Sequence, residues 1–266
     1  MHDPTDPAGR SEDIAMAFQP VVDLARGEIF AYEALVRPAP YGNAHPGCAS
    51  DIFSRIEGPR LGAFDERCRA LAIQTAARLG FTGFLALNCM PEALDDPRAS
   101  LVRSLAIAAA GRVGAHRLIL EVTGGAASLD SGWLRGVVAD FRSEGVVTAI
   151  DDFGAGHGSL NLLADCQPDL VKLDVRLIRG IHRDRARRAI VRAVMTMCAD
   201  LGISLIAEGV EDVAEAYELR ELDVRLFQGN LFGHPEVNLL PQPNFAVMDQ
   251  LTGQHAALRL LETGRG

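Results

Sequence analysis

Two adjacent aspartates stand at the end of a short apolar segment. Val146 to Ile150 is a run rich in β-branched residues that predicts a buried strand, and Asp151 and Asp152 follow it directly. The glycines at 154 and 156 let the backbone turn sharply and approach a ligand closely. Neighbouring carboxylates repel each other unless a cation lies between them. The pair therefore indicates a divalent metal ion or, as the simpler alternative, a solvated turn with Asx-type hydrogen bonds.

The rest of the chain favours the metal, because polar side chains end almost every expected strand. In chain order they are Glu33, Asn88, Glu121, Asp151 with Asp152, Lys172 with Asp174, Glu208 and Gln228. The strand ends of a closed parallel barrel share one mouth, so these side chains would converge. Carboxylate and amide oxygens, without His or Cys, suit two Mg²⁺ or Mn²⁺ ions bridged by one carboxylate. Such a pair of ions serves phosphoryl chemistry, and Arg37 and the arginines near Arg179 and Arg183 are available for phosphate contacts.

The elements that must position these side chains alternate between strand and helix. Residues 16–22 and 28–36 are expected strands joined by a turn, which predicts a hairpin. From about residue 64, amphipathic helices ended by glycines alternate with short apolar runs, and the final helix is expected at 245–260. This alternation predicts an α/β fold whose parallel sheet can close into a barrel. We expect one domain at residues 14–266 behind a flexible N-terminus at 1–13.

The expected helices carry apolar residues at helical spacing. One such stripe runs from Trp133 to Phe141, and another runs from Ile190 through Val194 and Cys198 to Leu201. Stripes of this kind usually pack against a sheet. We therefore expect these side chains, Trp133 included, to belong to the core.

Composition restricts the class of protein. The chain has 266 residues, 48% of them apolar, and a formal net charge of −9, so we expect a sizeable core and no non-specific binding to DNA. No apolar run is long enough to span a membrane, and the polar start lacks a signal-peptide core. The five cysteines show no CxxC spacing and indicate reduced thiols. We expect a cytoplasmic protein.

Several short motifs occur in the order in which one known family carries them. They are Phe18-Gln19-Pro20, Glu33-Ala34-Leu35 with Arg37, Asn88, Leu120-Glu121, Asp151-Asp152-Phe153-Gly154, Lys172-Leu173-Asp174, the segment 207–211 and Gln228-Gly229. Together they resemble the EAL-domain family of cyclic di-GMP phosphodiesterases, from about Phe18 to Pro235. The resemblance implies a modified (β/α)8 TIM barrel with an antiparallel first strand, in agreement with the expected hairpin.

The resemblance also implies a role for each matching residue. The ligands of a first metal ion would be Glu33, Asn88, Glu121 and Asp151. Asp151 would bridge to a second ion that Asp152 and Glu208 also hold. Lys172 would orient and help activate the attacking water, with Asp174 and Gln228 in support. The implied substrate contacts are Gln19, Leu35 and Arg37, and the implied reaction hydrolyses one phosphodiester bond of cyclic di-GMP to linear pGpG.

Two positions depart from the family's pattern. Gly124 stands where the family usually has a Glu that braces the loop after the aspartate pair, and His157 stands within that loop where Tyr is common. Positioning errors of about an ångström cost roughly a hundredfold in rate. The alternative is therefore a weak or inactive EAL domain that serves as a cyclic di-GMP receptor or a protein-interaction module.

Two further hypotheses concern chemistry and assembly. A metal-dependent barrel that uses Lys172 as a base on a carbon acid also suits carboxylates at strand ends, but it leaves Glu33 and Asn88 unexplained. By the resemblance we expect a homodimer formed through the barrel. The residues contain no sensor or cyclase motif, so a regulatory protein partner or oligomerisation would control activity.

Overall fold

A β-hairpin opens the fold. The computed structural model describes residues 14–39, 52, 56, 58–90, 93, 96–123, 131–155 and 159–253. Strands β1 (Ile14–Asp23) and β2 (Glu28–Pro38) pair antiparallel over their whole length. Asp23 closes the turn, because its carboxylate accepts hydrogen bonds from the backbone N–H groups of Ala25 and Arg26. The predicted hairpin is confirmed, with longer strands than the sequence indicated.

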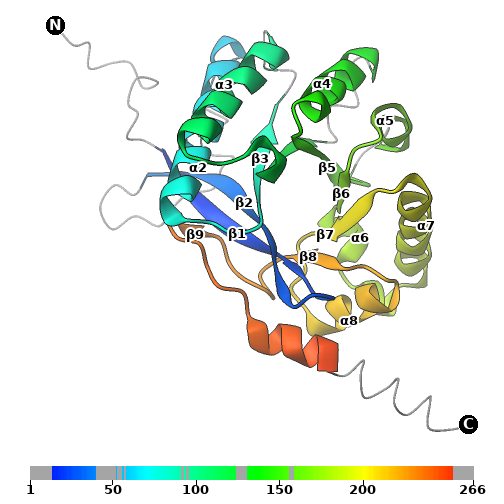
Figure 1. The fold of residues 1–266 in the computed structure, drawn as a ribbon. Helices are drawn as coiled ribbons and strands as arrows, with labels where there is room; N and C mark the ends of the chain where they lie inside the picture. Colours follow the sequence, from blue (N-terminus) through cyan, green and yellow to red (C-terminus); the bar gives the residue numbers. More distant parts are fainter. Residues whose placement is uncertain are drawn as a thin grey trace, which may run out of the picture.

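The other strands of the barrel follow one another around a ring. They are β3 (Phe84–Cys89), β4 (Leu118–Thr123), β5 (Val147–Phe153), β6 (Leu170–Leu173), β7 (Ser204–Ala207) and β8 (Leu226–Gln228). Neighbouring strands from β2 to β8 are parallel, and β8 pairs antiparallel with β1. Since β1 also pairs with β2, the sheet closes into an eight-stranded barrel (Figure 1). The prediction of a modified (β/α)8 barrel with an antiparallel first strand is confirmed.

Helices surround this ring on the outside, as Figure 1 shows. The longer ones are α2 (Gly58–Leu79), α3 (Pro97–Ala110), α4 (Ser131–Ser143), α5 (Ser159–Cys166), α7 (Arg185–Leu201) and α8 (Val213–Glu221). Three short elements lie between them, η2 (Ala115–Arg117), α6 (Val175–Ile178) and η4 (Ile181–Arg183). Residues 245–253 are helical and contact α8 through a hydrogen bond from Arg220 to the Leu251 carbonyl. The two-residue strand β9 (Glu236–Val237), which pairs with β1, was not predicted.

Aspartates begin several of these helices. Asp96, Asp184 and Asp212 precede α3, α7 and α8, and each side chain accepts a hydrogen bond from a backbone N–H of the first turn. These groups have no partner within the helix, so an N-cap carboxylate satisfies one of them. Gly202, in a left-handed conformation, ends α7 where the sequence predicted a stop.

Two separate apolar cores stabilise the barrel. The larger lies between strands and helices and includes Phe18, Leu85, Phe141 and Phe227. The smaller fills the inside of the barrel with one side chain from each of the eight strands, and we call it the apolar interior cluster. Its members are Val21, Ala31, Ala86, Ile119, Ala149, Leu170, Ile206 and Leu226.

The edges of the predicted helical stripes are exposed. Trp133 is 37% exposed, Ile190 47% and Leu201 44%, so their assignment to the core was wrong. The buried positions are their neighbours Leu134 and Val191, together with residues further along each stripe. Successive helical residues are separated by about 100° around the axis, so a side chain adjacent to a buried one can leave the packed face.

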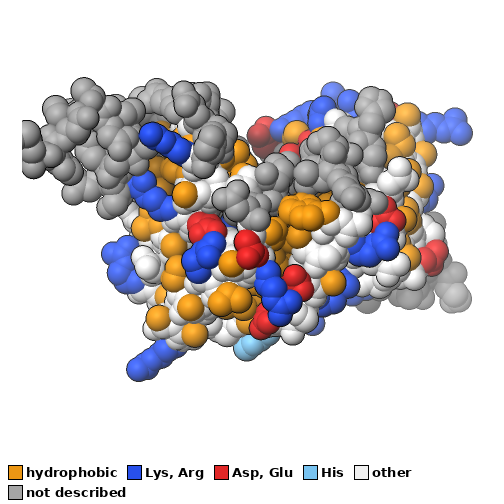
Figure 2. All heavy atoms as spheres, turned by 90° about the horizontal axis from the view of Figure 1, so that it is seen from above, with side chains coloured by type: hydrophobic (Ala, Val, Ile, Leu, Met, Phe, Trp, Pro, Cys, Tyr) orange, Lys and Arg blue, Asp and Glu red, His pale blue; other side chains and the backbone are white. Residues whose placement is uncertain are grey.

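The outer surface carries charges of both signs. Ion pairs join neighbouring helices, with Arg98 of α3 3.1 Å from Asp140 of α4 and Arg135 of α4 3.2 Å from Asp165 of α5. Figure 2 shows blue and red side chains interspersed with apolar ones on the described part of one side of the molecule. Within the described part of the chain, no helix has both the length and the apolar character needed to cross a membrane.

Candidate active site

A layer of polar side chains lies directly above the apolar interior cluster. We call it the polar interior cluster, and its members are Gln19, Glu33, Asn88, Glu121, Asp151, Lys172, Glu208 and Gln228. On each parallel strand the polar residue stands two positions after the apolar one, as Glu33 does after Ala31. On antiparallel β1 the order is reversed, and Gln19 precedes Val21. Side chains two apart point to the same face of a strand, so one interior layer receives a polar residue from every strand.

These residues lie at the same level inside the barrel, but not all of them are at the end of their strand. Glu33 is the sixth residue of β2, which continues to Pro38 because β1 pairs with it there. Asp151 likewise lies within β5, which ends at Phe153. Glu121 is also two residues before the end of its strand, β4. The sequence prediction that each residue ends its strand was therefore wrong for these three, although the predicted convergence is present.

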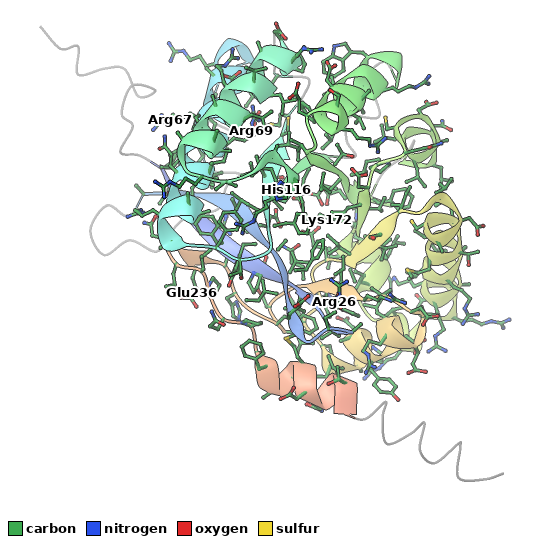
Figure 3. The ribbon with its side chains drawn as sticks, viewed as in Figure 1. Arg26, Arg67, Arg69, His116, Lys172 and Glu236 are labelled. Atoms are coloured by element: carbon green, nitrogen blue, oxygen red, sulfur yellow. The ribbon has the colours of Figure 1, made fainter. Side chains whose placement is uncertain are left out.

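Lys172 is at the centre of the polar interior cluster. Its side chain is completely buried, and its Nζ lies 3.1 Å from Glu33, 3.1 Å from Glu121, 3.3 Å from Asp151 and 3.5 Å from Glu208. Figure 3 shows it in the middle of the strand ring. One ammonium group thus faces four carboxylates, so the cluster has a surplus of negative charge.

The amide side chains connect the remaining members to Glu33. Asn88 Nδ2 donates to Glu33 at 3.2 Å, and Gln228 Nε2 donates both to Glu33 and, at 3.2 Å, to Gln19. Gln19 in turn donates to the Gly233 carbonyl at 3.0 Å. Hydrogen bonds and ion pairs therefore join the eight side chains, one from each barrel strand or the residue just after it, into one network.

Burial and like charge shift the ionisation of this network. Burial raises the pKa of Glu121 well above its usual value, against the influence of Lys172. Burial also raises the pKa of Glu208, to about 8. For Lys172, burial alone would lower the pKa, but the surrounding carboxylates raise it well above the ordinary value. In the metal-free chain the lysine is therefore held as a cation, whereas burial opposes the ionisation of Glu121 and Glu208.

Three carboxylates form a compact group at one side of the network. Asp151, Asp152 and Glu208 each offer an oxygen within 4.8 Å of the others, and we call them the acid triad. Asp152 has a φ of 54°, a left-handed conformation that is uncommon outside glycine, and its N–H donates to Asp151 at 2.9 Å. Glu208 Oε2 is buried and accepts no hydrogen bond within the described part of the chain. This donor set fits a hard divalent cation.

Asp174, expected in a supporting role, lies at the start of α6. It is the N-cap of α6, and its carboxylate accepts from the backbone N–H of Arg176 at 2.7 Å and from Arg176 Nε at 2.9 Å. Burial would raise the pKa of Asp174, but these bonds lower it overall. The sequence analysis did not identify Arg176 as a hydrogen-bond donor to Asp174. Its position two residues after an aspartate that begins a helix could have indicated this contact.

The expected substrate residues lie along β2. Leu35 and Arg37 follow Glu33 at intervals of two and so share its face of the strand. Arg37 Nη1 donates to the Val36 carbonyl at 2.9 Å. Arg179, expected among the phosphate contacts, is paired with Glu211 at 2.9 Å. Gly124 and His157 lie outside the described residues, so the predictions that rest on them stay predictions.

Solved structures share this barrel. A standalone versatile EAL protein from Vibrio cholerae, solved with c-di-GMP bound, has a TM-score of 0.83 and 38% identity, over 90% of this chain and 99% of that one. BlrP1 of Klebsiella pneumoniae, in a manganese and cyclic di-GMP complex at pH 9.0, has a TM-score of 0.78 and 34% identity, over 90% of this chain and 58% of that one.

Curated relatives are longer than this chain. The blue light- and temperature-regulated antirepressor BluF of Escherichia coli is 29% identical over 226 residues, which are 85% of this chain and 55% of BluF. The cyclic di-GMP phosphodiesterase NbdA of Pseudomonas aeruginosa is 31% identical over 232 residues, which are 85% of this chain and 29% of NbdA. The chain thus spans about half or less of these relatives.

A family model agrees with the structural likeness. The model described as EAL domain matches residues 6–235, a range that contains every member of the polar interior cluster. The chain therefore belongs to the EAL domain family.

Proposed function

We propose that this protein hydrolyses one phosphodiester bond of cyclic di-GMP to linear pGpG, with the help of two divalent cations. The observation that carries the proposal is the buried Lys172 among four carboxylates, a surplus of negative charge that a metal would neutralise. The relatives support the choice of substrate, because NbdA is named as a cyclic di-GMP phosphodiesterase and two similar structures hold the dinucleotide.

The proposed metal ligands come from the polar interior cluster and from Asp152. One ion would be held by Glu33, Asn88, Glu121 and Asp151, and the other would be held by the acid triad, so Asp151 would belong to both sets. When bound, Mg²⁺ or Mn²⁺ lowers the pKa of a water molecule and neutralises charge on the reacting phosphoryl group. Glu208 Oε2 supports this assignment, because among the described residues this buried oxygen accepts no hydrogen bond and only shares, at 3.5 Å, an ammonium group that three other carboxylates also contact.

Lys172 acts as a donor in this proposal. Burial lowers the pKa of Lys172, but in the metal-free chain the surrounding carboxylates raise it overall. As an ammonium group, Lys172 would hold and orient the attacking water and stabilise negative charge. A carbon-acid reaction would instead need Lys172 as a neutral base. Gln228 supports the position of Glu33, and Asp174 fixes the start of α6 just beyond Lys172.

Residues along β1 and β2 would bind the substrate. Arg37 offers a guanidinium group to a phosphate, and Leu35 offers apolar contact to a base. Gln19 is held in place by Gln228 and the Gly233 carbonyl. A homodimer formed through the barrel and control by a regulatory protein partner complete the proposal.

A second function is favoured by one relative. BluF is named as an antirepressor, which indicates that an EAL relative can act on another protein. The alternative is therefore a receptor for cyclic di-GMP, or a protein-interaction module, with little or no hydrolysis. Retention of Lys172 with all expected metal ligands argues for the enzyme.

Incubation of the purified protein with cyclic di-GMP and Mg²⁺ or Mn²⁺, with chromatographic detection of pGpG, tests the proposal. Glu33→Gln should abolish turnover, because it removes a charged ligand and alters the contact with Lys172. Glu236→Gln, at an exposed position on β9, is the matched control and should keep full activity. Nucleotide binding without product formation would instead establish the receptor, and absence of both would reject the ligand assignment.

A further inference from the structure

The short helix α6 packs between the two segments that carry the acid triad. A Cβ atom placed on Gly154 would lie 2.5 Å from Leu177 Cδ1, and one placed on Gly209 would lie 2.8 Å from Val175 Cγ2. Gly154 comes two residues after Asp152, and Gly209 directly follows Glu208. Two of the apolar side chains of α6, Val175 and Leu177, therefore lie against the backbone next to two triad members.

Only glycine suits these two positions. Gly154 has a φ of 95° and Gly209 a φ of 71°, both in the left-handed region. Glycine adopts this region without the steric cost that a Cβ imposes, and it also lets another group approach the backbone closely. The chain thus combines two turns that require glycine with two side chains that fill the resulting space.

Both ends of α6 are fixed to other elements. At its start, the N–H of Asp174 donates to the Phe153 carbonyl at 3.1 Å. At its end, the N–H of Gly180 donates to buried Glu215 of α8 at 2.7 Å. Arg187 of α7 donates to the Arg176 carbonyl at 3.0 Å. These hydrogen bonds connect α6 to β5, α7 and α8, with Val175 and Leu177 facing the segments that follow β7 and β5.

We infer that Val175 and Leu177 are positioning residues that set the distance between Asp152 and Glu208, and thereby the affinity of the acid triad for a divalent cation. The inference rests on the metal site of the proposed function. The triad carboxylates repel one another. Pairing with β6 sets the spacing of β5 and β7, but the register shifts between Ile150 and Phe153, and Glu208 lies one residue beyond β7, so the strand pairing does not by itself position Asp152 and Glu208. Groups that orient metal ligands typically contribute about 10- to 100-fold in metal affinity.

Mn²⁺ binding to the purified, nucleotide-free protein tests the inference by isothermal titration calorimetry. Val175→Ala and Leu177→Ala should each weaken binding, and the double variant should weaken it at least about tenfold. Matched controls are Val102→Ala and Leu201→Ala, which remove the same side chains from exposed positions on α3 and α7. Both controls should bind Mn²⁺ as the unaltered protein does.

A conservative variant separates positioning from general loss of stability. Leu177→Met preserves side-chain volume and should keep Mn²⁺ affinity within about twofold, whereas Leu177→Ala should not. Thermal unfolding of every variant shows whether it is folded at the titration temperature, and Val175→Ala removes only two methyl groups from a partly exposed side chain.

Three outcomes decide the matter. Weaker Mn²⁺ binding in the α6 variants alone supports the inference, even if the unaltered protein shows no hydrolysis and the proposed function fails. Equal affinity in the double variant and the controls overturns the inference, even if hydrolysis is observed. Absence of Mn²⁺ binding to the unaltered protein overturns the inference together with the metal site.

Discussion

Two cations are buried among the described residues, Arg69 and Lys172, and the charged clusters around them differ in composition. One surrounds Arg69 between α2 and α3, and the other surrounds Lys172 inside the barrel (Figure 3). Both cations are nearly or completely inaccessible to solvent. The clusters differ in the number of carboxylates that contact each cation.

The Arg69 cluster is balanced. Arg69 forms an ion pair with Asp65, donates to Ser100 at 2.6 Å and lies 3.4 Å from the Ser104 hydroxyl. The N–H of Met90, just after β3, lies 3.5 Å from the same Asp65. One cation thus meets one buried carboxylate, and neutral hydroxyl groups complete its hydrogen bonds. Such an arrangement joins α2, α3 and β3 and leaves little capacity for a ligand.

The Lys172 cluster is unbalanced. Four carboxylates surround one ammonium group, and two buried oxygens, Glu208 Oε2 and Gln228 Oε1, accept no hydrogen bond from the described residues. The apolar interior cluster below excludes water from that side. Uncompensated buried charge is costly. Its presence therefore indicates a ligand-binding site, whereas a balanced ion pair indicates a role in stabilising the fold.

Removal of Lys172 should have the largest effect on activity. Lys172→Met keeps all expected metal ligands but removes the donor for the attacking water, so the hydrolysis rate should fall by about 10²- to 10⁴-fold. Mn²⁺ affinity should be retained, because a competing cation is lost and every oxygen ligand stays. Turnover assays and calorimetry check both parts, and nearly full activity would contradict the assigned role.

Removal of Arg69 should affect stability alone. Arg69→Met removes the cation that forms a buried ion pair with Asp65, which should lower the free energy of unfolding by about 3–5 kcal/mol. Urea denaturation measures the loss, and Mn²⁺ affinity should stay within about twofold. Arg103→Met, which breaks an exposed pair with Glu66, is the control and should cost much less. A parallel loss of Mn²⁺ binding would show that the two clusters are not independent.

The smallest expected effect is a dependence on pH. With a pKa of about 8 in the metal-free protein, Glu208 should be about five times more ionised at pH 8 than at pH 7. Because the cation needs the ionised form, Mn²⁺ affinity should rise about fivefold over this interval. Glu208→Gln should weaken binding and flatten this rise. An equal pH dependence in both proteins would assign it to another group.

The same pKa has a consequence for folding. Between the ordinary pKa of 4.5 and about 8, the folded metal-free chain holds a proton on Glu208 that the unfolded chain has released. The folded state then binds more protons, so the contribution of Glu208 to the free energy of unfolding decreases as pH rises through this window. The difference in urea midpoint between the unaltered protein and Glu208→Gln should therefore change with pH.

Much of the barrel could be predicted because its pattern is local. Strands and helices of ordinary length alternate along the chain. Gly202 ends α7 because glycine readily adopts the left-handed conformation found there. The predicted site residues came from the positions of polar side chains after apolar runs, and the structure brings the polar interior cluster together. The exposure of Trp133 and the existence of β9 were missed, because each depends on which neighbouring element covers a position.

The amino-acid sequence by itself determined which strand carries which polar residue, since a spacing of two fixes the face of a strand. Only the tertiary structure decided which other residues those side chains contact. Lys172 and Glu33 are 139 positions apart, and Gln228 and Glu33 are 195 apart, yet they are in contact. The packing of Val175 near Gly209 and of Leu177 near Gly154 also joins residues that are distant in sequence, although less so. Closure of the barrel brings the polar groups together and buries them, and burial raises the pKa of Glu121 and Glu208.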